Sequence, residues 1–514
     1  MARKKAERDH EAPPTFAARL PLWVGLFAVL VAAFHAFFQI ELIDEGVLTM
    51  GAWRITQGQI PYRDFFAFYT PGSFYLVALA FKLFGVSLAA SRVVAVALGA
   101  ALVAATAGLA LRAIRAPLFA TVPVAVLCQA GLGGWPMASH HWIADLGCVA
   151  AAWLLLRALD ERPFLWSSLA GAAAAVAFWS LTGQGALMAI LTAALVLFAV
   201  PSPSRRSILT GWSAGIAAVS VPFLFLLLRV DGATLRYDLV TFATTAYKSI
   251  EGNRYGFTFP VRELAQQWAS GAWRAAPLYT IVVTATSVAL WLGPIVAAVL
   301  VAVSYAKRWD TAPRRGIIVA LALTFVLTVA WRWAPINLQW TAIGPALMIA
   351  WALSRWSRKR LAAGIAWAWI AAFAFVGAYR IGMTLSPDGW VALRTPAGTW
   401  KSFNKRQASQ LQGLVDEIGK RLSPDEPLLC KSVPLVNFMT RHPNPTRFDL
   451  FVPPDYTPEP QVREAIATLD RIHLRWIATP AFVPSESLFD RWLLEHYELA
   501  WDNGEFGLWQ RTAP

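Results

Sequence analysis

Charged residues are scarce in this chain. Asp, Glu, Lys and Arg make up 15% of its 514 residues, whereas 57% are hydrophobic, which gives a mean hydropathy of +0.48. A soluble domain carries about 25% charged residues. This scarcity excludes an ordinary soluble globular protein and predicts a polytopic α-helical membrane protein, because several apolar runs are long enough to cross a bilayer.

Cysteine is also rare. Cys128 and Cys148 lie in apolar runs, and Cys430 stands alone near the C-terminus, so neither a disulfide framework nor a zinc motif can be built. The sequence also lacks a Ser-His-Asp arrangement, a specific phosphate-binding glycine loop and internal repeats. We therefore assign no metal and no cofactor, without excluding a divalent ion. The missing repeat disfavours a carrier built from inverted halves.

Acidic residues are outnumbered, with 31 against 45 basic residues and a net charge of +14. Such an excess also occurs in proteins that bind nucleic acid. Here, however, Lys and Arg concentrate in short loops between apolar runs, as the positive-inside rule requires. The basic charge therefore indicates membrane topology, and we expect no nucleic-acid partner.

Eleven apolar segments have the length and composition of membrane spans. They are residues 21–40, 92–111, 117–133, 142–157, 164–181, 185–200, 208–228, 277–303, 316–332, 338–354 and 361–383. If the N-terminus lies in the cytoplasm, every loop on that side is basic, whereas the short opposite loops 134–141, 182–184 and 333–337 contain no Lys or Arg. The first span lacks a clear cleavage site, so we expect a retained signal anchor.

Two segments on the outer side are too long for simple turns. Residues 41–91 contain two amphipathic stretches, 45–57 and 71–84, and each predicts a helix that lies in the membrane interface. Residues 229–276 are richer in polar and aromatic side chains than the spans that flank them. These two segments are therefore the places where a site facing the outer side would be built.

The composition changes after Leu385, where charged residues and proline become more frequent. The patterns predict strands at 427–431, 474–479, 498–501 and 507–510 and helices at 407–421, 459–470 and 486–496. This length suffices for one small α/β domain. We therefore divide the chain into a transmembrane domain, residues 1–384, and a C-terminal outer domain, residues 385–514.

The acidic pair Asp44-Glu45 is the most informative feature of the chain. It follows the first span, and acidic groups at such an edge are costly to remove from water, so they usually serve a function. The motifs that follow are Gly58-x-x-Pro61-Tyr62-x-Asp64-Phe65, Pro71-Gly72-x-x-Tyr75-Leu76, Leu83-Phe84-Gly85 and Arg92. In order and spacing, residues 44–92 resemble the first outer loop of the GT-C superfamily of polyprenol-dependent glycosyltransferases. The similarity is to bacterial relatives of protein mannosyltransferases and of the lipid A aminoarabinose transferase.

The resemblance implies a GT-C-like membrane fold and an enzyme in a bacterial inner membrane. Such an enzyme transfers a sugar, with inversion, from a polyprenyl-phosphate donor to a lipid, glycan or protein acceptor at the periplasmic face. Asp44 matches the catalytic acidic position of the family and is the expected general base. Glu45 is expected to support Asp44 or to orient the acceptor. From the residues alone, capping of the following helix explains the pair as well.

The leaving group of this reaction is a lipid phosphate, which nearby cations stabilise. The candidates for binding the donor phosphate are Arg63, Arg92, Lys248, Arg254 and Arg332. For each of them, snorkelling of a long basic side chain to the interface is the alternative. Asp64 is expected to pair with Arg63 or to lie in solvent.

Polar and aromatic side chains near the outer ends of the spans complete the predicted site. The substrate-binding candidates are Tyr62, Asp64, His140 and His141. The two histidines suit phosphate binding, acid catalysis or metal ligation. They are explained equally by an interfacial position beside Trp142, which we favour because adjacent residues on a helix do not share a face.

A polar cluster in the tail, Asn444, Arg447 and Asp449, lies between prolines. Turn chemistry produces such clusters for structural reasons, so these residues stay outside the predicted site. A polymerase or ligase of polyprenol-linked glycans and a non-catalytic transporter or flippase remain as alternative functions. A transporter is expected to carry charges at mid-span, whereas the ionisable residues here collect at one membrane face.

Overall fold

The computed structural model describes residues 16–512 except 131–134, 136, 250–267, 270–273, 275, 331–334, 387, 454 and 482–486. Within these residues, nine helices are long and apolar enough to cross a membrane. They are α2 (Phe16–His35), α5 (Leu88–Ile114), α8 (His140–Ala158), α9 (Pro163–Ser180), α10 (Thr182–Ala199), α11 (Ser202–Leu227), α17 (Pro277–Ala306), α18 (Ala312–Ala330) and α21 (Lys359–Leu385). The prediction of a polytopic helical membrane protein is therefore confirmed.

Nine of the eleven predicted spans coincide with these helices, and the other two are divided. Residues 117–133 contain α6 (Pro117–Ala125) and α7 (Leu127–Ala130). Residues 338–354 contain α20 (Ile343–Arg355) and part of α19 (Pro335–Trp340). A hydropathy window registers the length of an apolar run but not a break in its helix, so it returned two spans where the structure has pairs of short helices.

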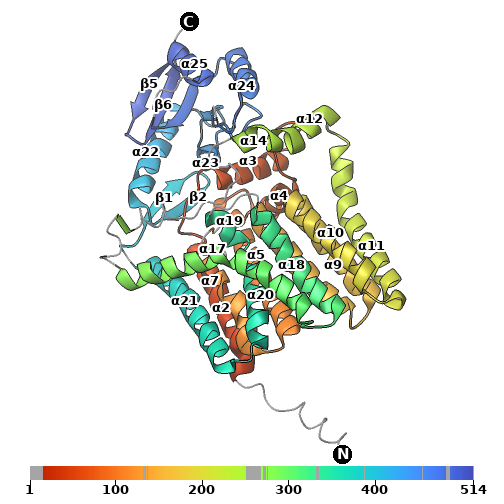
Figure 1. Ribbon diagram of the computed structural model, residues 1–514. Coiled ribbons are helices and arrows are strands. Elements are labelled where there is room, and N and C mark those ends of the chain that lie inside the picture. Colours follow the sequence, from red (N-terminus) through yellow and green to blue (C-terminus); the bar gives the residue numbers. More distant parts are fainter. Residues whose placement is uncertain are drawn as a thin grey trace, which may run out of the picture.

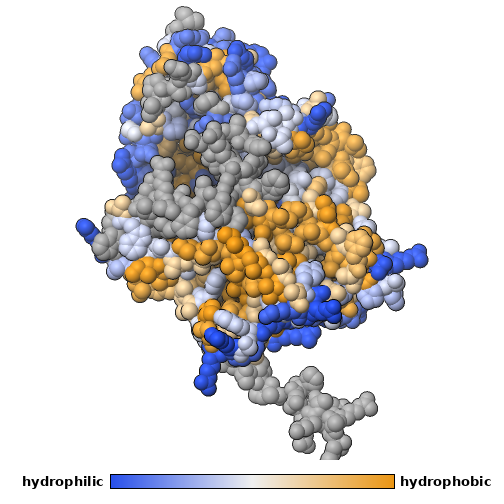
Figure 2. All heavy atoms as spheres, viewed as in Figure 1, coloured by the Kyte–Doolittle hydropathy of each residue, from blue (hydrophilic) through white to orange (hydrophobic). Residues whose placement is uncertain are grey.

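The helices form one bundle with the C-terminal domain at one end and the N-terminus at the other (Figure 1). We call the end next to the C-terminal domain the α3 face. Figure 2 shows an apolar band over the bundle, between the hydrophilic C-terminal domain and a hydrophilic rim at the opposite end. At that rim, Arg112 and Arg314 both form ion pairs with Asp160, which joins three of the basic loops.

The first long loop contains two helices, α3 (Asp44–Thr56) and α4 (Gly72–Phe84), as the sequence predicts. They cross at close range, because a Cβ atom at Gly51 would lie 2.6 Å from the ring of Phe74. The start of α4 is held against the end of α9, where the Thr70 hydroxyl donates to the carbonyl of Phe178 (2.9 Å). The loop is therefore packed on the bundle along most of its length.

The segment after α11 folds into α12 (Gly232–Arg236), the π-helix η1 (Tyr237–Thr241), α13 (Phe242–Thr244) and α14 (Ala246–Ser249). Phe242 is fully buried and contacts Phe66 of the first loop, with ring centroids 4.9 Å apart. The described part of the second predicted outer segment thus packs against the first one.

The C-terminal domain is built on a four-stranded sheet of order β3-β4-β6-β5. Its strands are β3 (Leu429–Cys430), β4 (Trp476–Pro480), β5 (Tyr497–Asp502) and β6 (Phe506–Arg511). β3 runs parallel to β4, and the other pairs are antiparallel. Three helices accompany the sheet, α22 (Lys405–Arg421), α24 (Glu459–Arg471) and α25 (Leu488–His496). All seven of these elements lie where the sequence predicts them.

The sequence patterns miss three elements of this domain. Two are the hairpin strands β1 (Val391–Thr395) and β2 (Gly398–Ser402), and the third is the short helix α23 (Pro434–Thr440). Every residue of α23 is buried, and the helix packs on α3. A seven-residue apolar segment has no periodicity that separates a helix from a strand. Its packing partner on α3, almost 400 positions earlier in the chain, explains why it forms a helix here.

Candidate active site

The structure separates the two members of the acidic pair. Asp44 is the first residue of α3 and is exposed, whereas Glu45 is fully buried. Glu45 Oε2 forms an ion pair with Nη2 of Arg92 at 2.5 Å, and the Arg92 side chain is 1% exposed. The same Nη2 also donates to the carbonyl of Gln39 (2.8 Å). Glu45 therefore anchors α3 to the bundle, and Asp44 is the carboxylate that an outside molecule can reach.

Glu41, which the sequence analysis did not single out, caps the start of α3. Its carboxylate accepts the backbone N–H groups of Ile43 (3.2 Å) and Glu45 (2.9 Å). Burial raises the pKa of Glu41 and raises that of Glu45 to about 7, while the charge of Arg92 opposes both shifts. Capping was the alternative explanation for the acidic pair, and the capping side chain is Glu41 instead.

The loop after α3 carries Tyr62, Arg63 and Asp64. Tyr62 is fully buried in the left-handed backbone region (φ 70°), and its hydroxyl donates to the carbonyl of Tyr69 (2.9 Å). The predicted pairing of Asp64 with Arg63 is confirmed, with Nη2 2.7 Å from Oδ2. This bond lowers the pKa of Asp64. The Arg63 side chain is 49% exposed and is thus the accessible cation of this loop.

A row of stacked rings lies near Asp44. Tyr69 stacks on His140 (4.4 Å between centroids), His140 lies 4.2 Å from His141, and His141 stacks on Trp340 (3.5 Å). The pKa of Tyr69 is raised by burial and then by the charges of Asp44 and Asp449. The row therefore joins the loop before α4 to α8 and α19.

The argument that adjacent histidines point apart is wrong here. His140 is the first residue of α8, where Ser139 caps the helix, and the end of a helix does not impose the spacing of its interior. Among the described residues, no group of three or more His, Cys, Asp or Glu side chains has the arrangement of a metal site. The histidines are thus members of an aromatic row.

The predicted phosphate-binding cations have different surroundings. Arg92 is buried beneath α3 in contact with Glu45, and Arg63 is exposed. Arg254 and Arg332 lie outside the described residues, and so does the side chain of Lys248. The structure adds Arg380 near the end of α21, where Nη1 donates to the carbonyl of Gln129 (3.0 Å). An arginine near the end of an apolar run is explained by snorkelling, so the sequence offered little reason to select it.

Asp145 is a second carboxylate that sequence reasoning passed over. It is fully buried in α8, one helical turn after His141, and Oδ1 accepts a hydrogen bond from Nε2 of Gln184 (2.7 Å). The sequence does point to Asp145, because an acidic residue inside an apolar span is rarely retained without a function. Gln184, near the start of α10, is buried with it.

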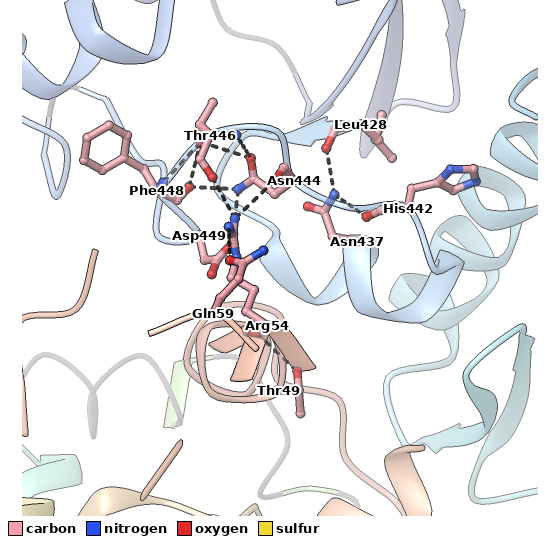
Figure 3. A network of polar contacts seen from close by, with 11 residues as sticks. Thr49, Arg54, Gln59, Leu428, Asn437, His442, Asn444, Thr446, Phe448 and Asp449 are labelled. Atoms are coloured by element: carbon pink, nitrogen blue, oxygen red, sulfur yellow. Dashed lines mark hydrogen bonds and ion pairs between the residues drawn. The ribbon is translucent and has the colours of Figure 1, made fainter. Parts of the chain in front are cut away.

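The tail cluster that the sequence analysis left outside the site contacts the far end of α3 (Figure 3). Nε and Nη2 of Arg54 donate to Oδ1 of Asp449 at 3.1 and 2.8 Å. The same Nη2 donates to the carbonyls of Thr446 (2.7 Å) and Asn444 (3.2 Å). The Arg54 and Asp449 side chains are buried, so the C-terminal domain is joined to α3 by a desolvated ion pair.

Arg447 extends these contacts to two further segments. Its Nη2 donates to the carbonyl of Tyr62 (3.0 Å) and lies 3.4 Å from Oδ2 of Asp238 in η1. The backbone carbonyl of Arg447 accepts the N–H of Phe66 (2.7 Å). Residues 444–449 thus contact α3, the loop after α3 and the segment after α11.

No protein-family model and no curated protein matches the chain. Among solved structures, ArnT from Cupriavidus metallidurans bound to undecaprenyl phosphate superposes with a TM-score of 0.60 at 14% identity, covering 96% of this chain and 98% of that one. Its apo structure gives a TM-score of 0.60 at 13% identity, with the same coverage. The chain therefore has the fold of these ArnT structures.

A third structure extends this result. The mycobacterial arabinofuranosyltransferase AftD gives a TM-score of 0.52 at 12% identity, and the match covers 96% of this chain but 40% of AftD. The GT-C fold implied by residues 44–92 is therefore confirmed over nearly the whole chain. At these identities, the likeness concerns the fold and leaves the reaction to be argued from the site.

Proposed function

We propose that this protein is a membrane glycosyltransferase that takes a sugar from a polyprenyl-phosphate donor, with Asp44 as general base. The observation that carries the proposal is the separation of the acidic pair in a chain of the GT-C fold. Glu45 forms a buried ion pair with Arg92, and Asp44 is exposed at the start of α3. The ArnT structure contains undecaprenyl phosphate, which supports a polyprenyl phosphate as the carrier.

In this reaction an acceptor hydroxyl or amine attacks the anomeric carbon of the donor sugar. Asp44 accepts the proton as the new bond forms, and the bond from the anomeric carbon to the phosphate oxygen breaks with inversion. Polyprenyl phosphate leaves with the bonding electron pair. The row formed by Tyr69, His140 and His141 packs ring against ring, with Phe74 and Trp340 at its ends, so it offers imidazole nitrogens rather than ring faces to the hydroxyl groups of a sugar.

The charge that develops on the leaving phosphate requires nearby cations. Arg63 is exposed in the first loop, so it is the described candidate that can reach a lipid phosphate without breaking a buried contact. Arg92 acts indirectly in this proposal, because it holds Glu45 and so the start of α3. Lys248 and Arg254 stay predictions from the sequence.

The orientation of the chain follows from its loop charges. The basic loops lie at the rim opposite the α3 face, so the positive-inside rule places that rim in the cytoplasm. We accordingly propose that Asp44 and the C-terminal domain lie at the periplasmic face of a bacterial inner membrane. An acceptor lipid, glycan or protein would reach Asp44 from that side.

A deletion strain tests the proposal. We expect mass spectrometry of its lipid extract to show an accumulated polyprenyl-phosphate sugar, which wild-type protein removes and Asp44→Asn does not. A variant that clears the lipid as fast as wild type would contradict the role of Asp44. Accumulation of a polyprenyl-diphosphate glycan would indicate a polymerase or ligase instead.

A further inference from the structure

The helix that carries Asp44 is weak by itself. α3 has 13 residues, two of which, Gly46 and Gly51, lower helix stability by about 1 kcal/mol each relative to alanine. Isolated helices of this length are marginal in water even with favourable sequences. Its geometry therefore depends on the surfaces that hold it.

One of these surfaces belongs to the C-terminal domain. A Cβ atom at Gly46 would lie 2.3 Å from the backbone nitrogen of Leu435 in α23, so glycine permits contact between the two backbones. The N–H of Leu435 donates to the carbonyl of Leu42 (3.1 Å), just before α3 begins. The start of α3, two residues from Asp44, thus lies directly against the C-terminal domain.

The other end of α3 is held by the same domain through Arg54. Its guanidinium donates to one carboxylate oxygen of Asp449 and to two carbonyls of residues 444–449, and Nη1 donates to Oε1 of Gln59 (3.2 Å). Asn444 in turn donates to Asp449 Oδ1 (3.2 Å) and to the carbonyl of Phe448 (2.9 Å). These bonds hold the Asp449 carboxylate in position to accept from Arg54. Figure 3 shows these groups converging on Arg54 from the C-terminal domain.

Arg54 and Asp44 lie near opposite ends of the same helix, α3. Ten residues separate them, which corresponds to about 15 Å along a helix. A tilt of α3 at its Arg54 end therefore moves Asp44. In enzymes generally, a displacement of 1 Å between reacting groups can lower the rate on the order of 100-fold.

We infer that Arg54 and Asp449 are positioning residues that set the location of Asp44 through α3, so that the C-terminal domain takes part in sugar transfer. This inference rests on the proposed function in assigning the base to Asp44. It differs from that function in placing a requirement for catalysis in the C-terminal domain, on residues that contact no substrate.

Two readouts on purified full-length protein test it. The first is amide hydrogen exchange of α3, which needs no substrate. The second is steady-state sugar transfer with the lipid-linked sugar extracted from the deletion strain as donor. For Asp449→Asn we expect about tenfold faster exchange over residues 45–50. We also expect kcat to fall about tenfold or more, with a change in donor KM below about threefold.

Matched controls come from the same domain. Arg463 pairs with Glu459 on α24 with both side chains more than 60% exposed, so Arg463→Gln removes an ion pair without touching α3. Gly46→Ala is a second test variant because it forces α3 away from Leu435, and Gly419→Ala on α22 is its control because nothing lies near the added methyl group. We expect both controls to match wild type in exchange and in kcat.

The outcomes separate this inference from the function on which it rests. If Asp449→Asn and Gly46→Ala leave the exchange of α3 unchanged, or speed it without lowering kcat, the positioning role is overturned. If Asp44→Asn transfers sugar at the wild-type rate, the proposed function fails, whereas the exchange data still show whether the C-terminal domain fixes α3. Should Asp449→Asn not fold, Gly46→Ala decides the question by the same two readouts.

Discussion

The two sides of α3 are held by ion pairs of different construction. Toward the bundle, Nη2 of Arg92 contacts Glu45 Oε2 and the carbonyl of Gln39, and Glu45 Oε1 is buried with no hydrogen-bond partner among the described residues. Toward the C-terminal domain, Arg54 shares its donors among a carboxylate, two carbonyls and an amide. The bundle contact reaches Glu45 through one of its carboxylate oxygens, whereas the guanidinium of Arg54 is shared among four acceptor groups. Removal of one charged partner should therefore lower the stability of the protein more on the bundle side.

Among the variants considered, Arg92→Ala is expected to lower the stability of the protein most. It leaves Glu45 buried without its counter-charge, and removal of one member of a buried pair typically costs about 3–5 kcal/mol of stability. We expect a clear drop in the melting temperature of the detergent-solubilised protein, followed by tryptophan fluorescence. Arg112→Ala, which breaks a partly exposed pair with Asp160, should cost about 1 kcal/mol or less. Equal shifts for the two variants would show that Glu45 and Arg92 do not anchor α3.

Asp238 contacts Arg447 of the C-terminal domain and so gives a test of the contacts on that side. Burial raises its pKa from 3.8 to about 7, although the charge of Arg447 opposes the shift. Between these values the folded protein binds a proton that the unfolded chain has released, so the contribution of Asp238 to stability is lost as pH rises through about 7. Asp238→Asn should therefore reduce the decline in melting temperature from pH 5 to pH 8. An identical decline in wild type and variant would contradict the raised pKa.

Arg63→Gln should have the smallest effect on stability, because the pair with Asp64 is exposed. We expect an unchanged melting temperature. If Arg63 contacts the lipid phosphate as proposed, however, binding of undecaprenyl phosphate should weaken about tenfold, since a charge-assisted hydrogen bond is lost. Calorimetric titration of detergent-solubilised protein measures this, with Arg463→Gln as control. Wild-type affinity in Arg63→Gln would remove Arg63 from the proposed site.

The sequence predicted most of the fold because hydropathy and loop charge act locally. The long spans, α3, α4 and the main elements of the C-terminal domain all follow from periodicity and composition within short windows. What it missed depends on contacts between distant segments. α23 is one example, because a short apolar run becomes a helix through its packing on α3.

The predicted site likewise depends partly on local sequence and partly on contacts between distant segments. Asp44 and Glu45 are adjacent in sequence, yet only the partner Arg92, 47 positions later, shows which one is buried. Arg54 lies in the predicted helix 45–57, and the sequence gives no sign of its partner Asp449, which is 395 positions away. Motif spacing therefore selected the residues of the candidate site, and the pairing of charges between distant segments divides these residues into accessible and buried ones.

The rate of sugar transfer by Asp44→Asn, compared with its affinity for undecaprenyl phosphate, tests the central claim most directly. Asparagine keeps the size of the side chain but cannot accept the acceptor proton, and the loss of a general base typically lowers the rate about 100-fold or more. The account predicts that loss in a single-turnover assay with the affinity for undecaprenyl phosphate unchanged. Transfer by Asp44→Asn at the wild-type rate would contradict it.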